Sequence, residues 1–324
     1  MSSQTSTSVD STVGTDASAD ATTAPLATVP TVKATRGEVA KSKAGAGDAP
    51  PEFAASVFTL RGLLARVKNV TRAVGLGLVG AAALVALWLV AVAYQPLLPG
   101  PSVVLNNLTE LLSWAFYSDG AEEVGIAVQL GTSLFRVFTG FAVAACIGIP
   151  IGLFMGTSKR AWQAANPVVQ VLRPVSPIAW YPIGLVVAQD APTAAIFVIL
   201  VTALWPIVLN TASGAASVPY DQRNVARVFQ FSRLAYLQHV LLPHTLPSIV
   251  TGLRLSMGIG WMVIVAAEAL SGGTGIGFFV WDAYNSDKAE EVISAIVLIG
   301  LVGLVLDMLF LWLQRLVSGM EGEK

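Results

Sequence analysis

Long stretches of apolar residues dominate this chain from about residue 73 to residue 313. A helix needs about 20 mostly apolar residues to cross the hydrocarbon core of a bilayer. The chain holds six such stretches, and four prolines interrupt the third. The pattern predicts an all-α membrane protein with six transmembrane helices, over residues 73–94, 133–155, 164–188, 191–213, 247–270 and 292–313.

Basic residues are sorted among the segments that connect these stretches. Segment 95–132 contains no Lys or Arg, whereas basic residues precede the first stretch and recur in segment 214–246. The short cytoplasmic loops of membrane proteins carry an excess of Lys and Arg. We therefore expect both termini, and the long 214–246 loop, on the cytoplasmic side of the membrane.

Segments of different composition flank the apolar body. Residues 1–52 contain no Phe, Trp or Tyr, and such a composition cannot bury enough apolar surface to fold. Residues 53–72 combine leucines with arginines, which is typical of a helix that lies on a membrane surface. We predict a disordered N-terminal tail over 1–52, a basic amphipathic lead-in over 53–72, a transmembrane domain over 73–315 and a cytoplasmic C-terminal tail over 316–324.

The composition excludes several classes of function. The 324 residues are 54% hydrophobic and only 12% charged, about half the charged share of an average soluble domain. A net charge of −1 gives no basic excess for binding nucleic acid. One cysteine and two histidines leave little for a metal site, and no P-loop or nucleophile elbow is present. We expect no metal, no cofactor and no catalytic residue in this chain.

The prolines of the third stretch prevent a regular helix there. Non-helical backbone at membrane depth is tolerated only where protein shields it or where it lines a water-filled cavity. One interpretation is a kinked packing helix that touches no substrate. We favour the other, a segment that lines a pathway, with the candidate residues Arg173, Pro174, Ser176, Pro177, Trp180 and Tyr181.

Ionisable side chains within apolar stretches are costly, so they are candidates for function. Arg136 lies near the outer end of the second stretch and Glu268 near the outer end of the fifth, while Arg254 and Asp307 lie closer to the cytoplasmic side. Anchoring or ion pairing is the commoner role of such residues. We nevertheless include Arg136 and Glu268 among the pathway candidates, with Arg136 placed to attract an anion from outside.

Three glycines of the second stretch, Gly148, Gly152 and Gly156, are spaced four residues apart. At this spacing they share one helix face and allow another backbone to approach closely. The stripe is therefore expected to pack against a helix. That helix can belong to this chain or to a second subunit, and the sequence leaves both possibilities open.

The long cytoplasmic loop contains a short amphipathic segment. Its apolar positions between residues 224 and 238 fit a helix that bends near Ser232. An amphipathic helix exposed beside a bundle needs a cover for its apolar side, and a groove on a partner protein is one way to supply it.

This loop resembles the cytoplasmic motif of ABC-type importer permease subunits. The family carries Glu-Ala-Ala, a Gly four positions after the second Ala, and a later Ile-x-Leu-Pro. The residues at those positions here are Asn224, Val225, Ala226, Gln230, Val240, Leu242 and Pro243. The spacing is kept, while the first, second and glycine positions depart from the family. The resemblance covers about residues 73–315 and implies the fold of a type I importer permease.

The resemblance also implies partners. A second copy of the permease would complete the pathway, two ATPase subunits would bind ATP and Mg, and an external solute-binding protein would deliver the solute, all at a bacterial inner membrane. The chain itself would lack an ATP site. Coupling to the ATPase would fall to Asn224, Val225, Ala226, Arg227, Val228, Phe229, Gln230, Leu242 and Pro243.

Segments 275–285 and 292–303 make the chain look most like the branch for nitrate, nitrite, cyanate and bicarbonate, with taurine and sulfonate importers next. Two other classes stay open. A secondary transporter or channel would predict an inverted repeat, which is not visible in the sequence. A membrane scaffold or enzyme is disfavoured by the missing catalytic cluster.

Overall fold

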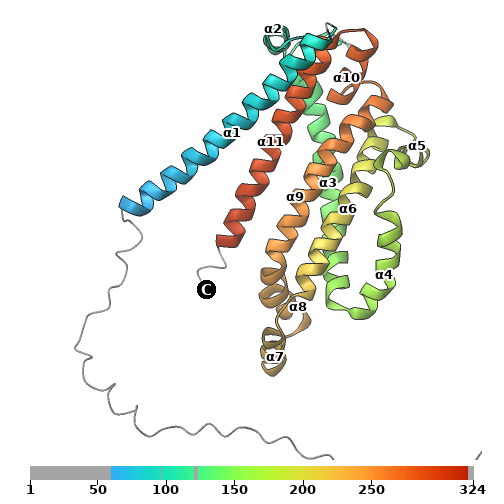
Figure 1. The fold of residues 1–324 in the computed structure, drawn as a ribbon. Coiled ribbons are helices and arrows are strands. Elements are labelled where there is room, and N and C mark those ends of the chain that lie inside the picture. The colour runs from blue at the N-terminus through green and yellow to red at the C-terminus, as the bar shows by residue number, and fades with distance from the viewer. Residues whose placement is uncertain (1–59, 96, 120–122, 320–324) are drawn as a thin grey trace, which may run out of the picture. The chain divides into compact units, whose positions relative to one another are not determined.

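The described part of the chain is almost wholly helical (Figure 1). The structure is a computed structural model that describes residues 60–95, 97–119 and 123–319. Its longer helices are α1 Leu60–Tyr94, α2 Pro101–Ser113, α3 Ile126–Thr157, α4 Lys159–Leu172, α6 Ala191–Ala216, α9 Leu242–Ser271, α10 Ile276–Asn285 and α11 Ala289–Gly319. The shorter elements are β1 Ser118–Asp119, β2 Glu123–Val124, η1 Pro177–Trp180, α5 Tyr181–Ala188, α7 Tyr220–Val228, α8 Arg233–Tyr236 and η2 Leu237–Leu241.

Five of these helices are long and apolar enough to cross a membrane, and a sixth crossing follows if the bent pair of α4 with η1–α5 counts as one. The predicted all-α membrane fold is therefore confirmed. The second, fifth and sixth spans are longer than predicted, because α3 begins at Ile126, α9 at Leu242 and α11 at Ala289. The predicted tail 1–52 lies outside the described residues, as do residues 53–59 and 320–324.

Contacts between the long helices fix their directions. α3 and α6 run in parallel, because Gly140 lies against Ile199 and Gly152 lies against Thr211. α9 runs opposite to α6, with Gly252 beside Asn210, and α11 runs opposite to α9. The ends of α3, α6 and α11 and the beginning of α9 therefore meet at one end of the bundle.

We call this the basic end, because Lys159, Arg160, Arg227 and Arg315 lie in or beside the helices that meet there. The opposite end carries α2, the short β1–β2 pair and α10, none of which the sequence analysis predicted. Among the described residues of these connecting elements, Lys288 is the sole base. The charge sorting agrees with a cytoplasmic basic end, which stays a prediction.

The third predicted span, residues 164–188, is not one helix. α4 and the η1–α5 pair meet at an angle of 99° across a short break. Because α3 and α6 are parallel, the segment between them must return along the length of the bundle. The broken pair thus performs one crossing in two pieces (Figure 1).

Small residues let α3 and α6 approach closely. A Cβ atom on Gly152 would lie 2.6 Å from the Cβ of Thr211, and one on Gly156 would lie 2.3 Å from the carbonyl oxygen of Ala212. Gly148 would meet Ile207 in the same way. The glycine stripe is therefore occupied by α6 of the same chain, and this face is not free for a second subunit.

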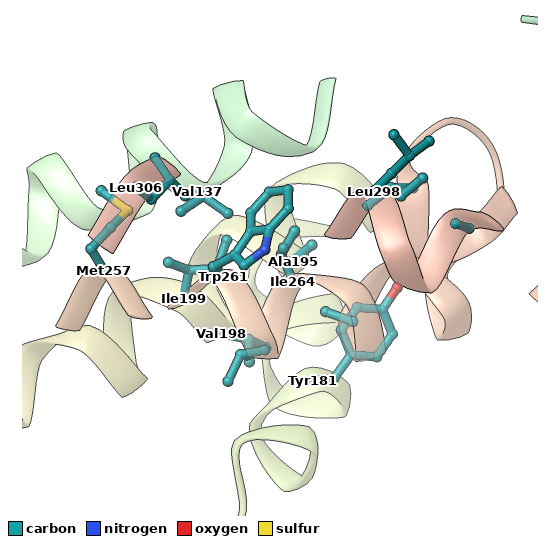
Figure 2. Packing of buried hydrophobic residues seen from close by; sticks show 14 of the residues in the cluster. Val137, Tyr181, Ala195, Val198, Ile199, Met257, Trp261, Ile264, Leu298 and Leu306 are labelled. Atoms are coloured by element: carbon teal, nitrogen blue, oxygen red, sulfur yellow. The ribbon is translucent and has the colours of Figure 1, made fainter. Parts of the chain in front are cut away.

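Trp261 of α9 lies at the centre of the largest apolar cluster (Figure 2). Ile199 of α6, Val137 of α3 and Leu306 of α11 belong to the same cluster, so it joins four helices. The indole N–H of Trp261 donates to the carbonyl oxygen of Ile299 at 3.0 Å. This bond satisfies a buried polar group that would otherwise be costly at membrane depth.

Candidate functional site

The break in the third span lies between α4 and η1. Pro174 and Pro177 lack a backbone N–H, and a proline disfavours the helical conformation of the residue before it. Ser176, which precedes Pro177, is accordingly extended, with φ −57° and ψ 132°. Pro174 and Ser176 are both exposed in the single chain. The sequence prediction of non-helical backbone at this position is confirmed by this geometry.

A hollow of about 210 Å³ opens beside the break. Arg173 and Trp180 line it from the broken span, Thr202 and Trp205 from α6, and Ile259 from α9. The structure thus brings three of the predicted pathway residues, Arg173, Pro177 and Trp180, to one hollow. Tyr181 does not line this hollow and belongs instead to the large apolar cluster, with 5% of its surface exposed (Figure 2).

Arg136 and Glu268 form a buried ion pair, with 2.7 Å between Nη1 of the arginine and Oε1 of the glutamate. Glu268 is fully buried and Arg136 is 7% exposed. Both were predicted as pathway residues. That role stays a prediction; in this chain the carboxylate is enclosed by protein and paired with the guanidinium.

The same glutamate organises the turn after α9. Its Oε2 accepts hydrogen bonds from Ser133 Oγ at 2.7 Å and from the Gly277 N–H at 3.1 Å. Arg136 Nη1 also donates to the Thr274 carbonyl oxygen at 2.6 Å. We give the name Glu268 network to the side chains of Gln129, Ser133, Arg136 and Glu268 together with the backbone of Thr274–Gly277.

Gly275 fits this network because it has no side chain. A Cβ atom there would lie 2.3 Å from the Glu268 carboxyl carbon, and its φ of 143° is a conformation that L side chains rarely adopt. Within the described residues, the Gly-rich run after α9 is held to α3 and α9 by the Glu268 network.

Arg254 of α9 and Asp307 of α11 form a second ion pair. The guanidinium binds both carboxylate oxygens, with distances of 2.8 Å and 3.0 Å. Their side chains are 32% and 46% exposed in the single chain. This pairing joins the two helices and supports the anchoring role that the sequence analysis considered commoner.

At the basic end, α7 carries an exposed apolar face. Val225, Val228 and Phe229 are 52%, 78% and 71% exposed, and their spacing places them on one side of a helix. Ala226, on the opposite side, is buried. α7 covers Tyr220–Val228, so the predicted helix over 224–238 begins earlier and is interrupted at Phe229–Ser232. We call Val225, Val228 and Phe229 the α7 apolar face.

Gln230, at the position where the importer family has glycine, lies at the end of α7. Gln230 has a left-handed φ of 49°, a conformation that costs little only for glycine. Its N–H donates to the Arg227 carbonyl oxygen, and the Phe231 N–H donates to that of Ala226. These two bonds are those of a Schellman motif, which stops a helix at a left-handed residue.

A larger hollow of about 720 Å³ lies beside α7. Val225 and Phe231 line it from the α7 segment, and His239, Pro243 and His244 line it from the start of α9 and the turn before it. Of the predicted coupling residues, Val225 and Pro243 reach this hollow. Leu242 is only partly exposed, so it contributes to packing at the base of α9.

Asp190 lies in the turn before α6 and binds Thr193 of that helix. Its carboxylate accepts hydrogen bonds from the Thr193 hydroxyl at 2.7 Å and the Thr193 N–H at 2.9 Å. These two bonds stabilise the ionised form and hold the pKa of Asp190 below its usual range. Asp190 thereby caps the beginning of α6, where free backbone N–H groups favour a negative charge.

Some participating residues were missed in the sequence. Gln129 and Ser133 are buried and polar, and with Arg136 they are spaced so as to share one face of α3. That polar spacing on an apolar helix was a visible signal. Trp205 gave no such signal, because an isolated tryptophan in an apolar stretch does not indicate which cavity it lines.

Comparison with known proteins shows what the chain resembles. Residues 148–319 match the family described as binding-protein-dependent transport system inner membrane component. The chain is 47% identical over 224 residues to the nitrate import permease protein NrtB of Synechocystis sp., covering 69% of this chain and 82% of NrtB. It is also 47% identical over 221 residues to the bicarbonate transport system permease protein CmpB of Synechococcus elongatus, covering 67% and 80%.

A solved structure shares the fold. The MetNI methionine ABC transporter in an inward facing conformation matches with a TM-score of 0.55 at 17% identity, covering 59% of this chain and 95% of that chain. At this identity the likeness concerns the arrangement of helices alone. Among the described residues of this chain, no group of three or more His, Cys, Asp or Glu could hold a metal ion.

Proposed function

The chain belongs to the family of binding-protein-dependent transport system inner membrane components, and on that premise we propose that it is the permease of an ATP-driven importer for a small inorganic anion. Nitrate is the first candidate and bicarbonate the alternative. Relatives named for nitrate and for bicarbonate are both 47% identical to this chain, so overall similarity does not favour one strongly. A taurine permease of Escherichia coli is 30% identical, which makes a sulfonate the more distant alternative.

The α7 apolar face carries the coupling part of this proposal. Exposed Val225, Val228 and Phe229 stand beside a hollow at the basic end. A helix with such a face is of the kind that docks into a partner's groove. We propose an ATPase subunit as that partner, with residues 224–230 making the contact and Leu242 and Pro243 supporting it from the start of α9.

The remaining partners follow from the division of labour in such an importer. A second copy of the chain would complete the pathway, and an external solute-binding protein would deliver the anion to the opposite end. Two partner ATPases would bind ATP and Mg. This chain would contribute only differences in free energy between inward-facing and outward-facing states, and ATP binding on the partners would favour one of them.

Orientation and location complete the proposal. The basic end would face the cytoplasm of a bacterium, with both termini on that side of the inner membrane, because Lys and Arg gather at the ends of α3, α6 and α11. The segments 1–52, 53–72, 73–315 and 316–324 would be the tail, the surface helix, the transmembrane domain and the C-terminal tail. In a Cys146→Ser background, single cysteines introduced at residues 160 and 287 test this orientation: an impermeant reagent should label residue 160 from the cytoplasmic side and residue 287 from the outside, and the reverse would refute it.

Charge placed on the α7 apolar face tests the coupling. The double variant Val228→Glu with Phe229→Glu should abolish solute-dependent ATP hydrolysis, while the protein still inserts into the membrane. The matched control, Val228→Ile with Phe229→Leu, keeps the surface apolar and should retain coupling. Unchanged ATP hydrolysis in the charged variant would show that α7 does not dock on the ATPase.

Uptake by the complete complex tests the substrate. Cells that lack their own carriers, supplied with this permease, its ATPases and its binding protein, should accumulate labelled nitrate when ATP is present. Accumulation of labelled bicarbonate instead would replace nitrate by the alternative. Uptake by the permease without its ATPases would favour a secondary transporter or channel and would contradict the ATP-driven mechanism.

A further inference from the structure

Arg173 lies about halfway across the bundle. α4 has 14 residues, so Arg173 follows about 21 Å of helix, at 1.5 Å per residue, after the basic end. It lines a hollow together with Thr202 and Trp205, which stand near the middle of the 26-residue helix α6. Ile259, from the central part of α9, lines the same hollow. Two neighbouring helices therefore place this guanidinium at mid-depth.

The guanidinium of Arg173 has no partner among the described residues. The ion pairs formed there join Arg136 with Glu268, Arg254 with Asp307 and Lys288 with Glu291. No hydrogen bond from the Arg173 side chain is formed with another described residue either. An unpaired arginine at the centre of a bilayer is costly, and such residues face a water-filled cavity or bind a counter-ion.

The side chains around Arg173 supply hydrogen-bond donors for an anion. Trp180 and Trp205 line the hollow, and neither indole N–H makes a hydrogen bond with another described residue. An indole nitrogen donates hydrogen bonds and accepts none, and the guanidinium likewise only donates. The hollow of about 210 Å³ has room for about seven water molecules at ~30 Å³ each, so a small anion fits with part of its hydration.

The backbone beside Arg173 also indicates water. Pro174, Val175 and Ser176 are non-helical and exposed in the single chain. Lipid does not satisfy the polar groups of such backbone, so it must be covered by protein or line an aqueous cavity. The lipid phosphates lie about 15 Å away, half of the ~30 Å hydrocarbon core, and are therefore too distant to serve as the usual partner of this arginine.

We propose that Arg173, with Trp180 and Trp205, forms an anion-binding site midway along the pathway, at the break of the third span. The site takes a small, singly charged oxyanion, because a planar guanidinium matches two oxygens of such a group and the indoles can donate to others. This inference rests on the proposed function for the identity of the anion. It assigns a position and three side chains that the family membership leaves open.

A single positive charge suits a transient site. A solute in transit must bind well enough to enter and weakly enough to leave. Arg173 is the one basic residue that lines the hollow, and the rest of the lining is aromatic and apolar apart from Thr202, so the site meets both needs. The buried Arg136 cannot act in this way, because Glu268 already neutralises it.

Charge-selective labelling tests the site without reference to transport. The chain has one cysteine, Cys146, so Cys146→Ser gives a cysteine-free background in which Ser176→Cys places a thiol three residues from Arg173. In the assembled complex in membranes, an anionic methanethiosulfonate should modify this thiol faster than a cationic one of similar size. Arg173→Gln should reduce the ratio of the two rates.

The expected reduction follows from Coulomb's law. For unit charges about 8 Å apart, the rate of each reagent should change by about 2-fold at an effective dielectric constant of about 80 and by about 30-fold at about 20. The two reagents change in opposite directions, so their ratio should fall by roughly 6-fold to roughly 1,000-fold over that range. Nitrate or bicarbonate should also slow the anionic reagent. Absence of labelling by both reagents would refute an aqueous site, and a ratio unaffected by Arg173→Gln would refute the role of Arg173. A carboxylate of a second copy paired with Arg173 would also remove the preference and overturn the proposal.

Transport kinetics provide the second readout. Arg173→Gln should lower uptake at subsaturating anion by roughly 10-fold to 100-fold, the effect of losing hydrogen bonds from a charged group. Arg173→Lys should recover part of this loss because it restores the charge without the planar fork. Arg160→Gln, which removes an exposed arginine from the start of the same helix, is the matched control and should leave uptake unchanged. Equal effects of the two glutamine variants would overturn the site.

The two proposals fail in different ways. If the complete complex moves neither nitrate nor bicarbonate, the proposed function is wrong, and the labelling ratio still decides whether Arg173 creates an anion-selective hollow. If uptake proceeds and the labelling ratio ignores Arg173, the function stands and the site is wrong.

Discussion

Replacing Arg136 by methionine would leave the Glu268 carboxylate in the interior without its charged partner. Glu268 is fully buried, and Arg136 Nη1 lies 2.7 Å from its Oε1. Removing one partner of a buried ion pair typically costs about 3–5 kcal/mol, because the remaining charge is uncompensated. We expect Arg136→Met to destabilise the chain by about this amount.

Glu268→Gln in addition should restore much of that loss. A glutamine oxygen can still accept from Ser133 Oγ and the Gly277 N–H, which donate to Oε2 at 2.7 Å and 3.1 Å. The double variant therefore carries no unpaired charge and keeps these two donors satisfied. Replacing a buried ion pair by neutral groups of similar size is often close to neutral, so the double variant should be more stable than Arg136→Met alone.

Thermal unfolding in detergent measures this difference. A loss of 1 kcal/mol lowers Tm by about 2–4 °C for a domain of 150–250 residues, so Arg136→Met should lower Tm by roughly 6–20 °C. Arg254→Met serves as the control, because its ion pair with Asp307 is part-exposed and should respond less. Scans at one fixed rate keep the values comparable if unfolding is irreversible. A double variant as unstable as Arg136→Met, or less stable, would refute the reasoning.

Three further outcomes are expected. Gly152→Ala should destabilise the chain by about 1–3 kcal/mol in thermal unfolding, because the new Cβ would lie 2.6 Å from that of Thr211 across the α3–α6 contact. Gly300→Ala is the control: its new Cβ meets nothing within 4 Å, so the variant should be neutral or stabilising. Gln230→Gly should slow amide hydrogen exchange across residues 220–231. The left-handed conformation of Gln230 costs about 1 kcal/mol, and glycine adopts it without that cost. The Asp190 cap of α6 should persist from neutral pH down to about pH 4 and weaken as the pH falls through its lowered pKa, which hydrogen exchange of the Thr193 amide reports.

The membrane spans could be predicted because apolar length reports them directly. Helix α6 lies at Ala191–Ala216, close to the predicted 191–213. The first residues of α3 and α9 were harder to predict. Both helices begin before their apolar stretches, in segments that contain polar residues. The short helices α2 and α10 escaped prediction, since neither is long enough to cross a membrane.

The site was predictable in part for a similar reason. Prolines marked the break of the third span, and the unusual charge of Arg173 marked the hollow beside it. The pairing of Arg136 with Glu268 could not be seen, because the two residues are 132 positions apart and only the packing of α3 on α9 brings them together. Long-range pairing of this kind depends on the fold and leaves no local pattern.

The basic end of the bundle and the Glu268 network are joined by one continuous helical rod. Residues 233–271 run as a 39-residue helical segment through α8, η2 and α9, about 58 Å at 1.5 Å per residue. This rod begins just after the left-handed stop of α7 at Gln230 and ends three residues after Glu268.

Because a packed helix transmits displacement along its axis with little internal deformation, a shift imposed on α7 has a direct route to the Glu268 network. The π turn at Leu237–Leu241 is the irregular step on that route, and such turns frequently lie at functional sites. The buried ion pair at the far end then fixes the Gly-rich turn to the rod, so that the turn must move with α9 or the pair must break.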